Sequence, residues 1–206
     1  MELFTDFMGV DGGGQALGRF AHYLGGITWI GLLYFFNFIQ GAAFSEMGDA
    51  ARGEALRKIT WRTLWWFRWA AALTWVSGIW ILGTQELIND MDYWRSAPGM
   101  GIAFGMLLGT MMAANVWMRI WPAQQRIITA IKNGEAPDGA DVALAGTRSK
   151  PNTYMSAALL LFMIGVADEG AKLMTHDTLP TVGAVFILSF VIIKALYAKA
   201  AKVPGF

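Results

Sequence analysis

The sequence predicts an all-α integral membrane protein, a bundle of about five transmembrane helices with one short interfacial helix. Three observations lead to this fold class. Hydrophobic residues make up 55% of the 206-residue chain and charged residues only 15%, whereas soluble domains average about 25% charged residues. Several apolar stretches are long enough to cross a hydrocarbon layer of about 30 Å. Nearly all charged residues lie between these stretches.

The first predicted span, residues 21–44, is the stretch around which we expect the other helices to pack. Its 24 residues include no Lys, Arg, Asp or Glu and would extend about 36 Å as a helix. Polar side chains nevertheless recur along it. Because such groups are costly in lipid, we expect them to face the bundle interior, a cofactor or water. They are His22, Trp29, Tyr34, Asn37 and Gln40.

The next two predicted elements are an interfacial helix and a second span. Residues 45–62 are amphipathic and basic, which predicts a short helix lying against lipid headgroups. The second span, residues 63–82, holds several Trp residues and a single charge. That charge, Arg68, lies within about two turns of one end, where a long side chain can reach the interface.

The third span is predicted at residues 99–117, after an acidic connection that ends at Pro98. Gly101, Gly105 and Gly109 recur every four residues along it. Such a stripe of small residues lets another helix approach closely.

The rest of the chain contains a long polar stretch and two further spans. Residues 119–151 are polar with a Gly/Pro/Asp segment, and we expect a loop there. The fourth span, residues 153–167, is short. It is therefore either tilted little or extended by the polar residues that flank it. The fifth span covers residues 179–198 and is followed by a lysine-rich end.

Charge placement predicts the orientation of this five-span bundle. The segments 45–62, 119–150 and 194–206 hold four, five and three Lys or Arg residues. The intervening segments hold one each and carry nine of the fifteen acidic residues. By the positive-inside rule, the N-terminus lies outside and the C-terminus in the cytoplasm. We therefore expect a multi-pass protein of the bacterial inner membrane.

The absence of cysteine limits the chemistry that these residues can support. It excludes disulfides, iron–sulfur clusters, thiolate metal sites and covalent haem attachment through CxxCH. His22, about one turn inside the outer end of the first span, remains a candidate ligand for haem b. The alternative is a histidine hydrogen-bonded to a neighbouring helix. The other histidine, His176, lies in the outer loop before the fifth span and is a weaker candidate. We expect no metal beyond haem iron.

A second group of polar residues is predicted to converge at the inner membrane face. Arginine and amide side chains together suit a planar, anionic, hydrogen-bonding ligand, since forked donors match paired acceptors. The alternative is that these residues bind lipid phosphates and only set the topology. The group comprises Asn37, Gln40, Arg62, Arg68, Arg119, Gln124, Gln125, Arg148 and Asn152.

Four blocks of the chain resemble the membrane domain of the bacterial cytochrome-c-type urate oxidases. They are HYLGGITWIGLLYFFNFIQ (22–40), WRTLWWFRWAAALTWVSG (61–78), IWPAQQR (120–126) and TRSKPNTYMSAALLLFM (147–163), in the order of that family and over about half of the chain. The resemblance implies a multi-helix membrane domain, haem association and urate hydroxylation. The start of the first block is also similar to a membrane oxidase of haem biosynthesis, whose corresponding histidine is associated with haem.

The chain also departs from that family's pattern. Because it contains no cysteine, we expect no cytochrome c domain, and it has fewer predicted spans than the family. Lys150 and Pro151 interrupt the fourth block, and Asp168 and Glu169 stand where the family pattern predicts a histidine.

These observations lead to three functional hypotheses. The first is a small integral subunit of a membrane redox or energy-converting complex, with haem b at His22. Some of the aromatic residues would then pack against partner proteins. The second is a urate hydroxylase-type enzyme that passes electrons to a separate cytochrome c and holds its substrate with Arg62, Arg119, Gln124 and Asn152. The third is a structural subunit without a cofactor. Membrane lipids are expected partners in each case, and nucleic acid is not.

Overall fold

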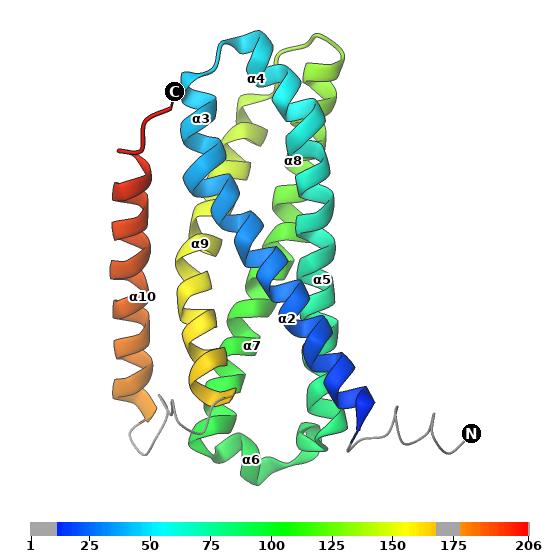
Figure 1. The fold of residues 1–206 in the computed structure, drawn as a ribbon, viewed down its shortest axis with the longest axis vertical. Coiled ribbons are helices and arrows are strands. Elements are labelled where there is room, and N and C mark those ends of the chain that lie inside the picture. Colours follow the sequence, from blue (N-terminus) through cyan, green and yellow to red (C-terminus); the bar gives the residue numbers. More distant parts are fainter. Residues whose placement is uncertain (1–11, 168–177, 206) are drawn as a thin grey trace, which may run out of the picture.

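Helices form all the regular structure of the described chain, as the sequence predicts. The computed structural model describes residues 12–167 and 178–205. In those residues the helices run along one long axis and form an elongated bundle (Figure 1). The predicted all-α fold is therefore confirmed for this part of the chain.

The first half of the chain forms two long antiparallel helical stretches. The first stretch consists of α2 (Gly13–Tyr34), the π-helical segment η1 (Phe35–Gln40) and α3 (Gly41–Glu46). The second consists of α4 (Asp49–Ala55), the π-helical segment η2 (Leu56–Thr60) and α5 (Trp61–Thr84). A short turn at Met47 and Gly48 separates them, because Met47 adopts an extended backbone conformation.

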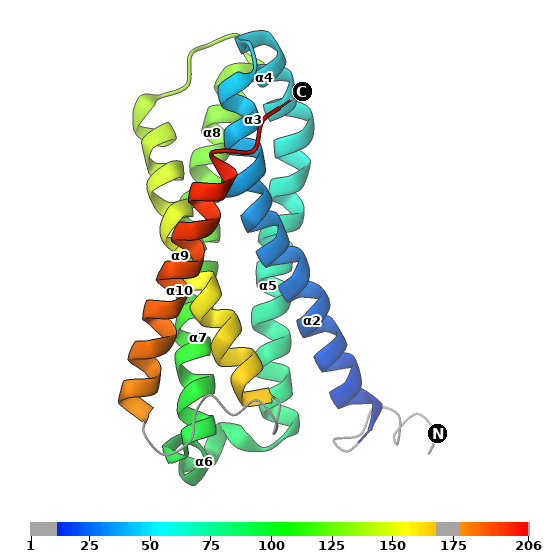
Figure 2. The same cartoon turned by 60° about the vertical axis from the view of Figure 1, so that its left-hand side comes forward.

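The second half adds the remaining helices. A short 3-10 turn, η3 (Leu87–Asn89), and α6 (Met91–Arg95) lead into α7 (Ala97–Asn115). The π-helical segment η4 (Val116–Ile120) joins α7 to α8 (Trp121–Lys132). Two long helices complete the bundle, namely α9 (Gly139–Ala167) and α10 (Thr178–Ala200), which lie side by side (Figure 2).

Three helices within the described residues are long and apolar enough to cross a membrane. They are Gly13–Glu46, Ala97–Lys132 and Leu179–Ala200, and they contain the first, third and fifth predicted spans. The second and fourth predicted spans lie in α5 and α9. Arg62, Arg68 and the Trp residues lower the hydropathy of α5, and the polar residues before Asn152 do the same for α9. Five membrane crossings therefore remain a prediction.

The predicted interfacial helix is helical, but it is not a separate element. Residues from Asp49 onward continue through η2 into α5 without a break. Figure 1 shows α4 at the end of the bundle, from where the chain descends into α5. The amphipathic pattern indicated the helix correctly, but nothing in the sequence between residues 55 and 61 stops it.

The loop prediction for residues 119–151 is wrong, because most of this stretch is helical. Only Asn133–Asp138 connects α8 to α9, and Gly134, two residues after the end of α8 at Lys132, has a φ of 78°. Ala123 and Ile127 of α8 are buried against Ala145 of α9. A narrow apolar face on an otherwise polar helix therefore supports this hairpin.

The fourth predicted span is extended by its polar flank, which is one of the two alternatives that its short length allowed. α9 contains 29 residues and continues through Pro151, which lies inside the helix. Because proline lacks an N–H group, it removes one backbone hydrogen bond at that point.

Glycines allow the helices to pack closely at two interfaces. A Cβ atom added at Gly25 of α2 would lie 2.7 Å from Thr74 Oγ1 and 3.0 Å from the Thr74 backbone nitrogen of α5. A Cβ atom at Gly105 of α7 would overlap Met163 of α9. The predicted small-residue stripe therefore does face a neighbouring helix. The core between these helices is formed by large buried side chains, including Trp29, Leu33, Phe67, Met112 and Phe162.

Candidate functional site

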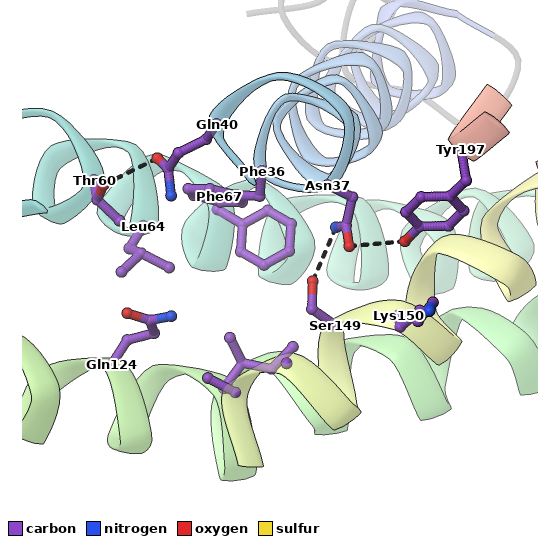
Figure 3. Close-up of a pocket in the computed structure, with 13 residues that line it drawn as sticks. Phe36, Asn37, Gln40, Thr60, Leu64, Phe67, Gln124, Ser149, Lys150 and Tyr197 are labelled. Carbon is purple, nitrogen blue, oxygen red and sulfur yellow. Dashed lines mark hydrogen bonds between the residues drawn. The ribbon is translucent and has the colours of Figure 1, made fainter. Parts of the chain in front are cut away.

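A cavity of about 260 Å³ lies between η1, η2, α8, α9 and α10. Figure 3 shows its polar side chains pointing inward from several helices. It is lined by Phe36, Asn37, Gln40, Thr60, Leu64, Phe67, Ile120, Gln124, Ala145, Gly146, Ser149, Lys150 and Tyr197.

Irregular helical turns frame this cavity. Each of the three π-helical segments among the described residues contributes to its lining. η1 provides Phe36, Asn37 and Gln40, whereas η2 provides Thr60 and η4 provides Ile120. Lys150 of α9 directly precedes the internal proline. A π-helical turn holds more residues than an α-helical turn, and such turns often occur at functional sites.

Asn37 connects three helices at one side of the cavity. Its Nδ2 donates to the Leu33 carbonyl and to Ser149 Oγ, both at 2.9 Å. The Tyr197 hydroxyl donates to Asn37 Oδ1 at 2.9 Å. Both atoms of this carboxamide are therefore engaged, so we expect Asn37 to hold η1, α9 and α10 together rather than to bind a ligand.

Two glutamines at the opposite side keep free hydrogen-bonding capacity. Gln40 Oε1 accepts a hydrogen bond from Thr60 Oγ1 at 2.9 Å, whereas its NH₂ group donates to no described residue. Gln124 Oε1 is buried and has no hydrogen-bond partner within residues 12–167 and 178–205. The two side chains extend into the cavity from η1 and α8 (Figure 3). Since a buried polar group without a partner costs about 1–3 kcal/mol, this arrangement favours a bound polar molecule.

Aromatic rings and one cation complete the cavity. The rings of Phe36 and Phe67 meet edge to face with centroids 5.3 Å apart. Lys150 is exposed, and its Nζ lies 5.7 Å from the centroid of the Tyr197 ring. The site therefore combines an apolar wall, amide and hydroxyl groups, and a positive charge at its rim.

Of the four residues that the sequence suggested for holding a substrate, only Gln124 lines this cavity. Arg62 is exposed, and its Nη1 donates to the Lys58 carbonyl at 2.6 Å. Arg119 is also exposed. Asn152 is fully buried, where it accepts from Asn115 Nδ2 at 2.9 Å and donates to the Met112 carbonyl at 3.0 Å.

Of the other residues predicted for the inner face, some line the cavity and others do not. The amides Asn37 and Gln40 line the cavity, but Gln125 does not. Arg148 is exposed, and Arg68 is surrounded by tryptophan rings on another face of α5. Sequence reasoning missed Thr60, Ser149, Lys150 and Tyr197. Ser149 and Lys150 fall in a block that the family resemblance had already singled out, whereas Tyr197 carries no signal beyond a hydroxyl in an apolar span.

His22 lies far along α2 from this cavity and packs against α5. Its Nδ1 lies 2.9 Å from the Thr74 carbonyl and 3.3 Å from Ser77 Oγ. Because a carbonyl only accepts, Nδ1 carries the proton and Nε2 keeps a lone pair. Histidines that bind metals usually show this arrangement, so His22 fits a haem ligand. No group of three or more His, Asp or Glu able to hold a metal ion occurs among the described residues. His176 lies outside them.

A comparison with protein families decides the affiliation of the chain. The sequence model of a family described as urate oxidase N-terminal matches residues 90–202. The chain belongs to the urate oxidase N-terminal family. The matched part of this urate oxidase N-terminal chain includes Gln124, Ser149, Lys150 and Tyr197 of the cavity. It contains two of the four blocks on which the resemblance was based, those at 120–126 and 147–163. No curated protein and no solved structure matches the chain.

Proposed function

We propose that this chain is a multi-pass subunit of a redox complex in the bacterial inner membrane, and that its cavity binds a small planar molecule of the urate type. The observation that carries this proposal is the free hydrogen-bonding capacity of Gln40 and Gln124 in a cavity whose other carboxamide is fully engaged. Membership of the urate oxidase N-terminal family supports the class of ligand.

The chemistry of the cavity matches that of a urate anion. Urate is flat, carries negative charge at neutral pH, and has both carbonyl acceptors and N–H donors. Gln40 offers N–H donors, and Gln124 offers an acceptor as well as donors. Phe36 and Phe67 supply an apolar wall, and Lys150 supplies a positive charge at the rim.

Oxidation of such a ligand would require a separate electron acceptor. Hydroxylation of urate takes its oxygen from water and releases two protons and two electrons. The 206 residues contain no cysteine for attaching a c-type haem. We propose that an electron acceptor outside these 206 residues, such as a cytochrome c that accepts one electron at a time, would complete the reaction as part of a larger complex.

The packing of the helices supports five membrane crossings. α5 lies against α2, and α9 lies against α7. In each pair, α5 or α9 has the lower hydropathy, and its neighbour belongs to a helix that is long and apolar enough to cross a membrane. By the positive-inside rule, the Lys and Arg distribution supports an orientation with the N-terminus outside and the C-terminus in the cytoplasm. In this orientation the cavity lies at the cytoplasmic end of the bundle.

Haem b at His22 is a second candidate function, favoured by the hydrogen bond from Nδ1 to the Thr74 carbonyl. A bound haem would supply one-electron transfer. The chain's own contribution would be to fix the orientation of the imidazole and to present Nε2.

Urate binding tests the proposed function directly. The purified chain, reconstituted in lipid nanodiscs, is titrated with radiolabelled urate. Gln124→Leu and Gln40→Leu should each weaken binding at least about tenfold, because each removes hydrogen bonds made inside the cavity. Gln125→Leu is the matched control, since the neighbouring glutamine does not line the cavity. Equal affinities of the wild type and Gln124→Leu, or no saturable binding, would contradict the proposal.

A reduced-minus-oxidised absorption spectrum tests the haem site. A b-type band that disappears in His22→Ala and persists in His176→Ala would support His22 as the ligand. A well-folded wild-type chain without a band would remove haem from the proposal. Failure of both tests would leave a structural subunit without a cofactor as the function of the chain.

A further inference from the structure

Arg68 of α5 is surrounded by tryptophan rings. The guanidinium carbon lies 4.0 Å from the ring centroid of Trp121. It also lies 5.4 Å from that of Trp117 and 5.7 Å from that of Trp69. The guanidinium lies closest to Trp121, and a planar guanidinium suits such a contact with an aromatic ring better than a lysine ammonium does.

The charge of Arg68 has no anionic partner among the described residues. Its Nε is buried without a hydrogen-bond partner, and none of its nitrogens forms a hydrogen bond or an ion pair within that part of the chain. Arg68 is only partly buried, and aromatic rings return only part of the hydration energy that such a cation loses. The guanidinium can therefore bind an anion that is not part of the described chain.

The position of Arg68 indicates where that anion lies. Trp117 Nε1 donates to the Arg68 backbone carbonyl at 3.1 Å, so the two residues are at the same level of the bundle. Trp117 is the last residue of the predicted third span (99–117), two residues before the exposed Arg119. Headgroup phosphates occupy this boundary between apolar and basic residues.

The surface beside Arg68 fits a lipid better than a dissolved ion. Trp65 and Trp69, on the same stretch of α5, are 44% and 47% exposed. Their rings contact each other at a centroid distance of 6.3 Å. Aromatic rings of this kind prefer the interface between acyl chains and headgroups.

We propose that this Arg68 site, formed by Arg68 with Trp65, Trp69, Trp117 and Trp121, binds one anionic phospholipid. The terminal nitrogens of Arg68 bind the phosphate, and the glycerol backbone and acyl chains lie over the exposed rings of Trp65 and Trp69. The site is separate from the cavity and does not depend on urate or haem.

Native mass spectrometry of the detergent-purified chain tests this site with added phosphatidylglycerol. Arg68→Gln should lower the affinity for the first phosphatidylglycerol at least about tenfold, since it removes the charge and the forked donors. The matched control is Arg119→Gln, which removes an exposed arginine near the same boundary and should retain wild-type affinity. Equal affinities of Arg68→Gln and the wild type would overturn the proposal.

A measurement on the wild-type chain serves if Arg68→Gln fails to fold. Brominated phosphatidylglycerol should quench tryptophan fluorescence at lower mole fractions than brominated phosphatidylcholine, because only the anionic lipid is drawn to Arg68. Inorganic phosphate at millimolar concentration should not displace it. Equal quenching by the two lipids, or displacement by free phosphate, would overturn the proposal.

Discussion

The hydroxyl of Tyr197 donates a 2.9 Å hydrogen bond to Asn37 Oδ1 across 160 positions of sequence. It ties α10 to the π-helical segment of the first stretch. Ser149 of α9 binds the same carboxamide from the other side. One amide therefore closes the wall of the cavity by joining helices from the beginning and the end of the described chain.

Tyr197→Phe should loosen α10 without removing its apolar contacts. Hydrogen bonds between membrane helices contribute about 0.6 kcal/mol on average and up to about 1.7 kcal/mol. We expect a fall of a few degrees in the melting temperature in detergent. Tyr23→Phe is the control, because Tyr23 is 60% exposed on α2. Equal melting temperatures of the two variants would show that this hydrogen bond does not hold α10.

Gly25→Ala should destabilise the contact between α2 and α5. The added methyl group would lie 3.0 Å from the Thr74 backbone nitrogen and 3.2 Å from the Ala70 carbonyl, and neither can move without shifting α5. Overpacking of this kind costs about 1–3 kcal/mol. In Gly31→Ala the methyl group meets nothing within 4 Å. That variant should be as stable as the wild type or slightly more so, which a denaturation series of both variants can check.

The hairpin of α8 and α9 should weaken in acid. Arg126 donates two hydrogen bonds to Asp141, at 2.8 and 2.6 Å, and these bonds hold the pKa of Asp141 below its ordinary value. A carboxylate whose pKa is lower in the folded state stabilises the fold above its unfolded pKa of about 4, and this contribution disappears as the pH falls through the folded pKa.

Asp141→Asn is therefore expected to lower the melting temperature at pH 7 but not at the acid end of a pH series. The control is Asp92→Asn, which removes an exposed carboxylate 4.0 Å from Arg95 and should have little effect at either pH. A deficit of Asp141→Asn that persists unchanged in acid would contradict the role of this ion pair.

Asn152→Ala should affect stability rather than ligand binding. Asn152 is fully buried, and its loss leaves Asn115 Nδ2 without its acceptor, at a cost of about 1–3 kcal/mol. Because Asn152 does not line the cavity, the affinity for urate should stay at the wild-type value. Asn89→Ala, at an exposed position, is the control for stability. A loss of urate affinity in a stable Asn152→Ala protein would show that Asn152 contributes to ligand binding.

Much of the helical framework could be predicted from the sequence, because an apolar run without charges has few alternatives to a helix in a membrane. α8 was not predicted, because its buried face is narrow and most of its residues are polar. The π-helical segments were not predicted either. One additional residue in a helical turn does not change the amino-acid composition in a recognisable way. The less favourable π-helical geometry is stabilised by contacts with helices that are distant in the sequence.

The cavity could be predicted only in part. The predicted topology brings the inner ends of the spans together, and Asn37, Gln40 and Gln124 do line one cavity. Topology does not determine which way a long side chain extends. Arg62 and Arg119 lie at the expected end but are exposed, as cations near an interface usually are.

The π-helical segment Phe35–Gln40 has a consequence for how this chain tolerates insertions and deletions. An α-helix turns by about 100° per residue. A deletion within α2, between Gly25 and Tyr34, would therefore rotate the residues before it by about that angle against Gly41–Glu46, and Gly25 and His22 would turn away from Thr74. The π-helical turn of η1 already holds one residue more than an α-helical turn, so a single deletion there that restores a regular α-helix would leave the phase of the two flanking helices nearly unchanged. The chain should thus tolerate the loss of one residue in η1 better than the loss of one residue in α2.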